Sequence, residues 1–359
     1  MNLTAYSAAI LAGAALLVLP ATAQETDNAT HTVTDRMGRT VELPVDIERI
    51  VTEFLPFPSA WFISTGSADE IVGMHPDSMR MAERALLGRI APNLLNAETG
   101  FTQGNSVNIE ELLRLSPDVF VSYETMPAIA DVERTNIPVL TMDVLSNSGG
   151  NVIQTYSGWM ELLGQVAGQQ ERTAEIIAFG QAALEDTRAR VAPLTDEQKP
   201  GALFFARLEE KSPKVNGAGH FGNFWVVESG ARNLAPADFA PLADIDMEQV
   251  YALNPEVIFI SNFSPTKPED LYENRVPGQD WSHVKAVQDK RVHKIPEGIF
   301  QWYPPSADAP LMLKWMAQKN QPELFAHYAI EDEIKSYYSR FYGYELSDDE
   351  VQLILNPQF

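Results

Sequence analysis

One segment of this chain occurs twice, and this repeat constrains the fold more than any other feature. The sequence VNIEELLRLSPDVFVSY at 107–123 returns as IDMEQVYALNPEVIFIS at 245–261, a shift of 138 residues (107 to 245). Each copy has a polar start, an apolar run with helical spacing, a proline and an apolar strand. Glu110 and Glu248 stand at the same place in the two copies. The repeat predicts two lobes of similar construction.

Strands alternate with helices around both copies, which is typical of βα units and a parallel sheet. A small hairpin precedes them, because TVTDRMGRTVELP alternates in polarity and turns at Met37 and Gly38. The sequence therefore predicts an α/β fold. Besides the strand in each copy, the predicted strands are 49–54, 70–74, 137–143, 201–208 and 291–296.

A long helical pattern separates the two lobes. Residues 169–194 are acidic early and basic late, as the helix dipole favours, and the helical pattern ends at Pro193. The predicted organisation is an N-terminal α/β lobe at 28–166, an interlobe helix at 167–194, a C-terminal α/β lobe at 199–328 and a helical tail at 329–359. Five aromatic residues of the tail are predicted to pack it on the body: Tyr337, Tyr338, Phe341, Tyr342 and Tyr344.

The first 23 residues have the pattern of a secretory signal peptide. An apolar stretch from Ala8 to Leu19 is too short to span a membrane and is followed by Ala21-Thr22-Ala23. Cleavage after Ala23 and export to a periplasm are predicted. The absence of cysteine excludes disulfides and a lipid anchor, and the net charge of −23 argues against binding to nucleic acid.

Motifs of enzyme chemistry are missing. The chain has no P-loop, no Gly-x-Ser-x-Gly and no His-Glu-x-x-His, and GAGHFG at 217–222 lacks the lysine of a phosphate loop. The six histidines are scattered without an i, i+4 pair, which leaves open only a metal site assembled across the lobes. A non-enzymatic protein is therefore predicted, with a secreted metal-dependent hydrolase as the alternative.

The two lobes, the long helix and the leader together resemble the helical-backbone class (class III) of periplasmic substrate-binding proteins. Its markers here are 33–51, both copies of the repeat, 281–296 and 306–317. Such proteins serve ABC importers of ferric siderophores, haem, cobalamin and some oxyanions. The resemblance implies two Rossmann-like lobes with parallel sheets joined by one long rigid α-helix. It also implies a periplasmic monomer that has no cofactor and no membrane anchor and works with a permease dimer.

The resemblance further implies that each lobe carries a surface glutamate that pairs with arginines of the permease. By position these are Glu110 and Glu248. An acid in the first turn of a helix also favours the helix dipole by about 0.3–1 kcal/mol, so a capping role is the alternative.

In this class the ligand lies in the cleft between the lobes, against loops at the carboxyl ends of the strands. Aromatic rings there suit a large organic ligand, Arg207 an anionic one, and His75 and His220 could bind a chelated metal. The alternatives are aromatic residues packed in the lobe cores and an Arg207 paired locally with Glu209 or Glu210. The candidate contacts are Phe57, His75, Met79, Tyr123, Glu124, Arg207, His220, Phe221, Asn262, Phe263, Gln301, Trp302 and Tyr303.

These residues predict a receptor for an iron–siderophore-type metal chelate. The alternatives are haem with an axial ligand from His75, His220 or Tyr123, cobalamin, and molybdate or tungstate. A free metal ion held by His75 and His220 is a further alternative. No metal is expected to be bound directly except through those two histidines.

Overall fold

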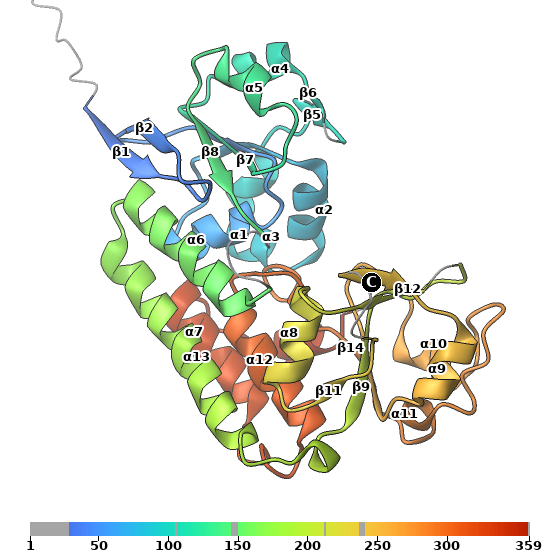
Figure 1. Cartoon of the computed structure of the whole chain (residues 1–359). Helices are drawn as coiled ribbons and strands as arrows, with labels where there is room; N and C mark the ends of the chain where they lie inside the picture. Colours follow the sequence, from blue (N-terminus) through green and yellow to red (C-terminus); the bar gives the residue numbers. More distant parts are fainter. Residues whose placement is uncertain (1–28, 105, 145–149, 212, 237–240, 358–359) are drawn as a thin grey trace, which may run out of the picture.

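Two sheet-containing lobes lie one above the other, with a wall of helices along one side (Figure 1). The computed structural model describes residues 29–104, 106–144, 150–211, 213–236 and 241–357. The predicted leader at 1–23 lies outside the described residues. Within them, no helix is long and apolar enough to cross a membrane.

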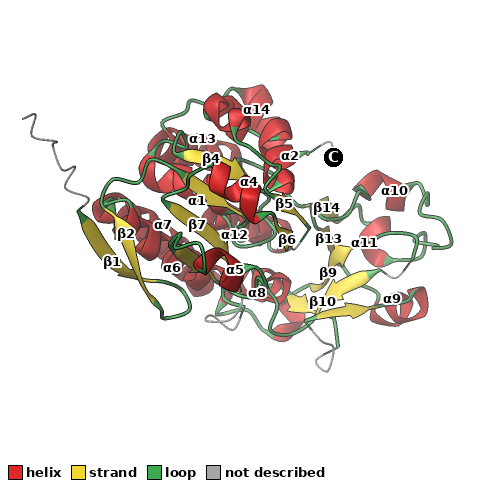
Figure 2. Ribbon diagram, turned by 90° about the horizontal axis from the view of Figure 1, so that it is seen from above, coloured by secondary structure: helices red, strands yellow, loops and turns green. Residues whose placement is uncertain are grey.

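The N lobe is built on a four-stranded parallel sheet in the order β4-β3-β7-β8. The β1–β2 hairpin forms as predicted and lies at the opposite end of the molecule from α9 and α10 (Figure 2). The strands are β1 Thr30–Thr34, β2 Thr40–Pro44, β3 Ile50–Thr52, β4 Ile71–Met74, β5 Thr102–Gln103, β6 Ser106–Val107, β7 Val119–Tyr123 and β8 Val139–Met142. The helices are α1 Phe57–Thr65, α2 Pro76–Arg84, α3 Leu87–Ile90, the 3-10 helix Pro92–Asn96, α4 Ile109–Arg114 and α5 Ile129–Glu133.

The C lobe has a mixed sheet in the order β12-β10-β9-β13-β14, with β11 also paired to β9. Strands β9, β11, β13 and β14 are parallel, whereas β10 and β12 run antiparallel, which differs from the predicted parallel sheet. The short connection after β9 returns the chain directly, which an antiparallel neighbour permits. The strands are β9 Gly201–Arg207, β10 Lys214–Asn216, β11 Arg232–Asn233, β12 Leu242–Asp244, β13 Val257–Ile260 and β14 Val292–Lys294. The helices are the 3-10 helix Asp196–Gln198, α8 Phe221–Glu228, α9 Met247–Leu253, α10 Pro268–Tyr272, α11 Lys285–Gln288 and α12 Ala309–Asn320.

The lobes are connected by a pair of helices, α6 Val152–Val166 and α7 Gln170–Val191. The chain reverses at Gly168, whose φ of +66° suits glycine. Gly164 permits the close approach, since a Cβ there would lie 2.2 Å from Oγ1 of Thr173. At 1.5 Å per residue, the 22 residues of α7 span about 33 Å, enough to run along both lobes.

One apolar cluster extends through both lobes and the helical wall. It includes Ile50 of the N lobe, Trp159 of α6, Ile176 of α7 and Phe204 of the C lobe. A large apolar contact between lobes opposes free rotation, so the molecule is stiff along this side.

The tail completes the wall with α13 Ile330–Tyr342 and α14 Asp348–Leu355, which are separated by Gly343 in the left-handed region. The predicted packing of its aromatic residues is confirmed for Tyr337, Tyr338, Phe341 and Tyr342, which are all buried.

Candidate ligand-binding site

The loop that follows β14 reaches the N lobe. Glu297 is buried and accepts two hydrogen bonds from Arg84 of α2, from Nε at 2.8 Å and from Nη2 at 3.0 Å. The backbone N–H of Leu86 donates to the carbonyl of Gly298 at 3.3 Å. Burial raises the pKa of Glu297, and the charge of Arg84 opposes that rise. The ion pair therefore fixes this loop against the N lobe.

Four predicted contacts come together in the C lobe around the ring of Tyr303. Phe221, Phe263 and His220 lie 4.6, 5.5 and 6.1 Å from it between ring centroids. The Tyr303 hydroxyl donates to Oδ1 of Asn216 at 2.7 Å. Burial lowers the pKa of His220 to about 4, so this imidazole is neutral at pH 7. Tyr303, Phe221 and His220 are buried, and Phe263, at 38% exposed, is the member of the cluster that solvent reaches.

Asn262 follows β13, and its side chain is hydrogen-bonded to the residue after β14. Its Nδ2 donates to the carbonyl of Ile295 at 2.9 Å. Arg207 ends the neighbouring strand β9, and its side chain is 58% exposed, 3.8 Å from the carboxylate of Glu209. The local partner for Arg207 that the sequence left open is therefore present, while its guanidinium stays accessible to solvent.

In the N lobe, two predicted contacts are held by the backbone nearby. The Tyr123 hydroxyl accepts from the N–H of Leu55 at 3.2 Å, and burial raises the pKa of Tyr123 to about 12. His75 caps α2, since its Nδ1 accepts from the N–H of Asp77 at 3.0 Å, and burial lowers the pKa of His75. The N–H of Glu124 extends the pairing of β7 with β8 by donating to Met142.

Two of the predicted aromatic contacts are packed inside the lobes. Phe57 is the first residue of α1, is 1% exposed and stacks on Trp61 at 5.7 Å. Trp302 is fully buried, and its indole N–H donates to Asp308 at 2.8 Å. A ligand role for either ring remains a prediction.

Asp308 organises the loop that carries Gln301, Trp302 and Tyr303, a role that no motif in the sequence indicates. Its fully buried carboxylate accepts from the indole of Trp302, the N–H of Ile299 and the hydroxyls of Tyr338 and Tyr342 of α13. Burial raises the pKa of Asp308, and the tyrosine and indole donors oppose the rise. The tail is thereby connected to the lobe boundary.

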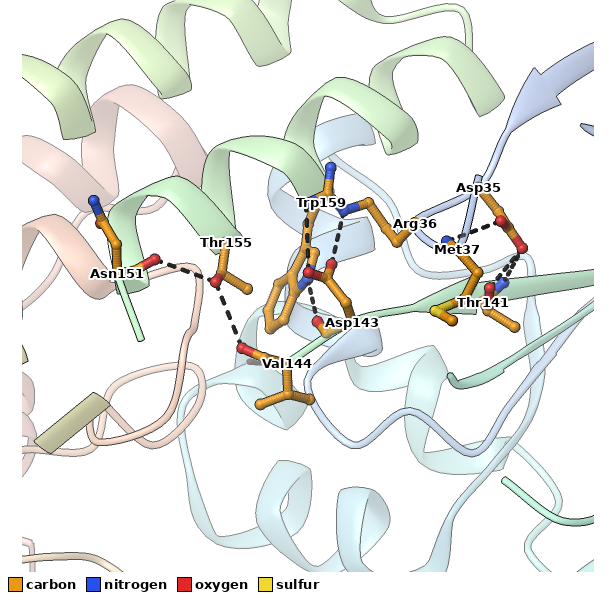
Figure 3. Close-up of polar contacts among 9 residues, drawn as sticks. All are labelled: Asp35, Arg36, Met37, Thr141, Asp143, Val144, Asn151, Thr155 and Trp159. Carbon is orange, nitrogen blue, oxygen red and sulfur yellow. Dashed lines mark hydrogen bonds and ion pairs between the residues drawn. The ribbon is translucent and has the colours of Figure 1, made fainter. Parts of the chain in front are cut away.

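A second buried carboxylate, Asp143, holds the end of β8 in the N lobe (Figure 3). Nε of Arg36, from the hairpin turn, donates to it at 2.7 Å. The indole of Trp159 in α6 donates to the backbone carbonyl of Asp143 at 2.8 Å. Arg36 lies against Gly158, where a Cβ would be 2.3 Å from its guanidinium. The hairpin thus holds the end of β8 against α6.

Just before α6, the chain passes close to the aromatic cluster of the C lobe. Gly150, with φ +90°, lies so near the carbonyl oxygen of Gly219 that a Cβ would be 3.0 Å from it. Gly219 directly precedes His220, so the two lobes meet beside this histidine.

The two predicted docking glutamates occupy equivalent places. Each is the second residue of a helix, Glu110 in α4 and Glu248 in α9, and each is exposed. Other side chains cap the two helices. Asn108 accepts from the backbone N–H of Glu110, and Asp246 accepts from the backbone N–H of Gln249. Neither glutamate carboxylate has an ion-pair or hydrogen-bond partner among the described residues, which leaves both available to a partner.

Metal binding was predicted only through His75 and His220. Among the residues that the structure describes, no group of three or more histidine, aspartate or glutamate side chains is arranged to hold a metal ion. The two histidines remain candidates for contact with a bound chelate.

The fold is that of a two-lobed solute receptor. The sequence model of the family described as periplasmic binding protein matches residues 58–298, and the chain belongs to this family. Its members are solute receptors of ABC transporters and carry no cofactor of their own, which agrees with the predicted class.

Individual relatives differ in what their names say they bind. The molybdate-binding protein MolA of Haemophilus influenzae is 25% identical over 344 residues, which cover 90% of this chain and 94% of MolA. The vitamin B12-binding protein of Vibrio campbellii is 24% identical over 257 residues, which cover 67% and 88% of the two chains. A periplasmic solute binding protein from Veillonella parvula has a similar solved structure, with a TM-score of 0.83 and 29% identity, covering 92% of this chain and 100% of that one.

Proposed function

We propose that this receptor binds a compact metal oxyanion of the molybdate or tungstate type between its lobes and delivers it to an ABC importer. The proposal replaces the siderophore-type chelate as first choice. Its main support is the packing of Phe57 and Trp302 inside the lobes, where their faces are not offered to a large planar ligand.

The polar groups near the strand ends suit an oxyanion. The Ser122 hydroxyl, at the end of β7, is buried without a hydrogen-bond partner among the described residues. A hydroxyl of this kind can donate to a ligand oxygen, and the accessible guanidinium of Arg207 can add a charge-assisted bond. The similarity to a molybdate-binding protein over 90% of this chain points to the same ligand class.

A ferric chelate of the siderophore type is the second candidate. Phe263 is 38% exposed after β13, and the exposed Arg207 ends the neighbouring strand β9. An aromatic edge next to a cation would suit an anionic organic chelate. Haem, cobalamin and a free metal ion are further outcomes of the same test.

Calorimetric titration of the purified, ligand-free protein distinguishes these ligands. Molybdate and tungstate are expected to bind with one site, and sulfate is the control for a non-specific anion effect. The Arg207→Gln variant is expected to bind molybdate more weakly, whereas Arg134→Gln, at an exposed ion pair with Asp131, serves as the matched control. Binding of a ferric siderophore, haem or cobalamin in place of both oxyanions would contradict the proposed ligand.

We also propose that Glu110 and Glu248 pair with cations on the permease. Ion pairs at such positions mainly set orientation and association rate. The double change Glu110→Lys with Glu248→Lys is expected to leave ligand binding unchanged and to abolish uptake. Glu83→Lys with Glu323→Lys, at exposed positions elsewhere in the two lobes, is the control. Uptake that survives the first pair of changes refutes the docking assignment.

A further inference from the structure

The two copies of the repeat agree in backbone conformation as well as in sequence. Each helix starts after a side-chain cap and ends before a residue in the left-handed region, Ser116 with φ 45° and Asn254 with φ 38°. The inner face of each helix is anchored by one buried residue, Leu112 in α4 and Val250 in α9. The outer faces of the two helices can therefore be compared position by position.

A large apolar side chain is exposed at the same place on both outer faces. Leu113 is 47% exposed, and Tyr251, its equivalent after the 138-residue shift (113 to 251), is 41% exposed. Each follows its docking glutamate by three residues. Residues three apart are neighbours on a helix surface, so each lobe presents a carboxylate beside an apolar group.

The rest of the chain leaves both of these side chains partly uncovered. A single exposed apolar residue is ordinary on a protein surface, but an exposed pair at equivalent positions of two lobes is a repeated feature. The hydroxyl of Tyr251 donates to the backbone carbonyl of Asp280, which tethers the ring and leaves part of its surface in solvent. Val227 and Leu353 are similarly exposed, at 49% and 45%, but lie outside the repeat.

We propose that Leu113 and Tyr251 are the apolar halves of a two-part docking footprint, Glu110 with Leu113 on one lobe and Glu248 with Tyr251 on the other. The partner is the pair of membrane subunits of an ABC importer, each presenting a cation next to an apolar surface. Buried apolar contacts supply affinity at an interface, while charges set the register. This inference rests on the proposed docking of the receptor, and not on the identity of its ligand.

Site-specific crosslinking in the bacterium that encodes the full chain tests the footprint. A photoreactive p-benzoylphenylalanine replaces Leu113, Tyr251 or, as a control, Leu353. Crosslinks from the first two positions to the transmembrane subunits of one ABC importer, identified by mass spectrometry, are expected, with none from the control. Adding Glu110→Lys to the Leu113 probe is expected to reduce its crosslinking.

Two substitutions measure the strength of the apolar contact. Leu113→Ser and Tyr251→Ser are each expected to weaken association with the importer by about tenfold, the usual scale for an interface anchor. Val227→Ser is the control. Molybdate titration of the same purified variants separates the two proposals, because loss of the footprint leaves titration unchanged. If molybdate does not bind but the crosslinks form, the proposed ligand fails and the footprint stands.

Three results overturn the footprint: no crosslink at Leu113 or Tyr251, equal crosslinking at Leu353, or crosslinking from one lobe alone. Unchanged association of both serine variants would also overturn it, since an anchor cannot be removed without loss of affinity.

Discussion

The N lobe and the C lobe differ in the groups that bind a fully buried aspartate near the lobe boundary. Each holds a segment near the lobe boundary by a fully buried aspartate, Asp143 in the N lobe and Asp308 in the C lobe. Asp143 faces the guanidinium of Arg36, whereas Asp308 accepts from neutral donors of Trp302, Tyr338 and Tyr342. Asp143 is therefore paired with a positive charge, whereas Asp308 is stabilised only by hydrogen bonds from neutral groups.

This difference affects how each lobe depends on the rest of the chain. The partner of Asp143 comes from the N-terminal hairpin, and two of the four donors to Asp308 come from α13 of the tail. A buried ion pair contributes little net stability, yet its disruption leaves an uncompensated charge. A carboxylate with only neutral donors is costly to leave charged. The C lobe should therefore respond to pH through Asp308, and the N lobe to the loss of a single cation.

The largest expected effect is that of Asp308→Ala. The change leaves the indole of Trp302 and the hydroxyls of Tyr338 and Tyr342 without their acceptor, while the N–H of Ile299 still donates to the Tyr338 hydroxyl. At about 1–3 kcal/mol for each buried unpaired group, the free energy of unfolding should fall by roughly 4 kcal/mol or more. Urea unfolding followed by tryptophan fluorescence measures it. Asp348→Ala, at an exposed ion pair, is the control and should cost less than about 1 kcal/mol.

Arg36→Ala is expected to cost about 3 kcal/mol, because Asp143 is left charged and buried. A second change, Asp143→Asn, should restore part of the lost free energy of unfolding by removing that charge. Arg134→Ala breaks an exposed pair and is expected to change stability by less than about 1 kcal/mol. If Arg36→Ala cost more than Asp308→Ala, the comparison of the two lobes would be reversed.

The pH dependence of stability tests the environment of Asp308 directly. Burial raises the folded-state pKa of Asp308 above its usual 3.8, so the folded protein binds this proton more tightly than the unfolded chain. The stability from this group is present below pH 3.8 and is lost as pH rises through the folded pKa. Asp308→Asn removes this dependence of the free energy of unfolding on pH. The difference in unfolding free energy between wild type and Asp308→Asn should shrink from pH 4 upwards, and a constant difference would contradict the assignment.

The repeat and the alternation of helices and strands were predictable because they depend on local patterns. Pro117 and Pro255 separate helix from strand in both copies, and the strands after them are apolar. The antiparallel strands β10 and β12 were not predicted, because three residues are too few to show an alternating pattern. Helix α2 was also missed, although His75 and Pro76 mark its start.

The site was only partly predictable. Position at the end of a strand identified Tyr303, His220 and Phe221, which the structure brings together. It did not fix the direction of the Trp302 side chain, which follows from its bond to Asp308. The donors to Asp308 include Tyr342, 34 residues further along the chain, and no local pattern connects residues so far apart.

The smallest predicted effect tests how closely the two copies match. Ser116 and Asn254 both have positive φ, which costs serine more than asparagine. Ser116→Gly should therefore stabilise the protein by about 0.5 kcal/mol, since the relief exceeds the added freedom of the unfolded chain. Asn254→Gly should destabilise it by about 1 kcal/mol, because Oδ1 of Asn254 accepts from the N–H of Lys285 at 2.9 Å. Urea unfolding of both variants gives opposite signs if the copies share a backbone but differ in this hydrogen bond. Equal signs would mean that this hydrogen bond is not what distinguishes the two positions.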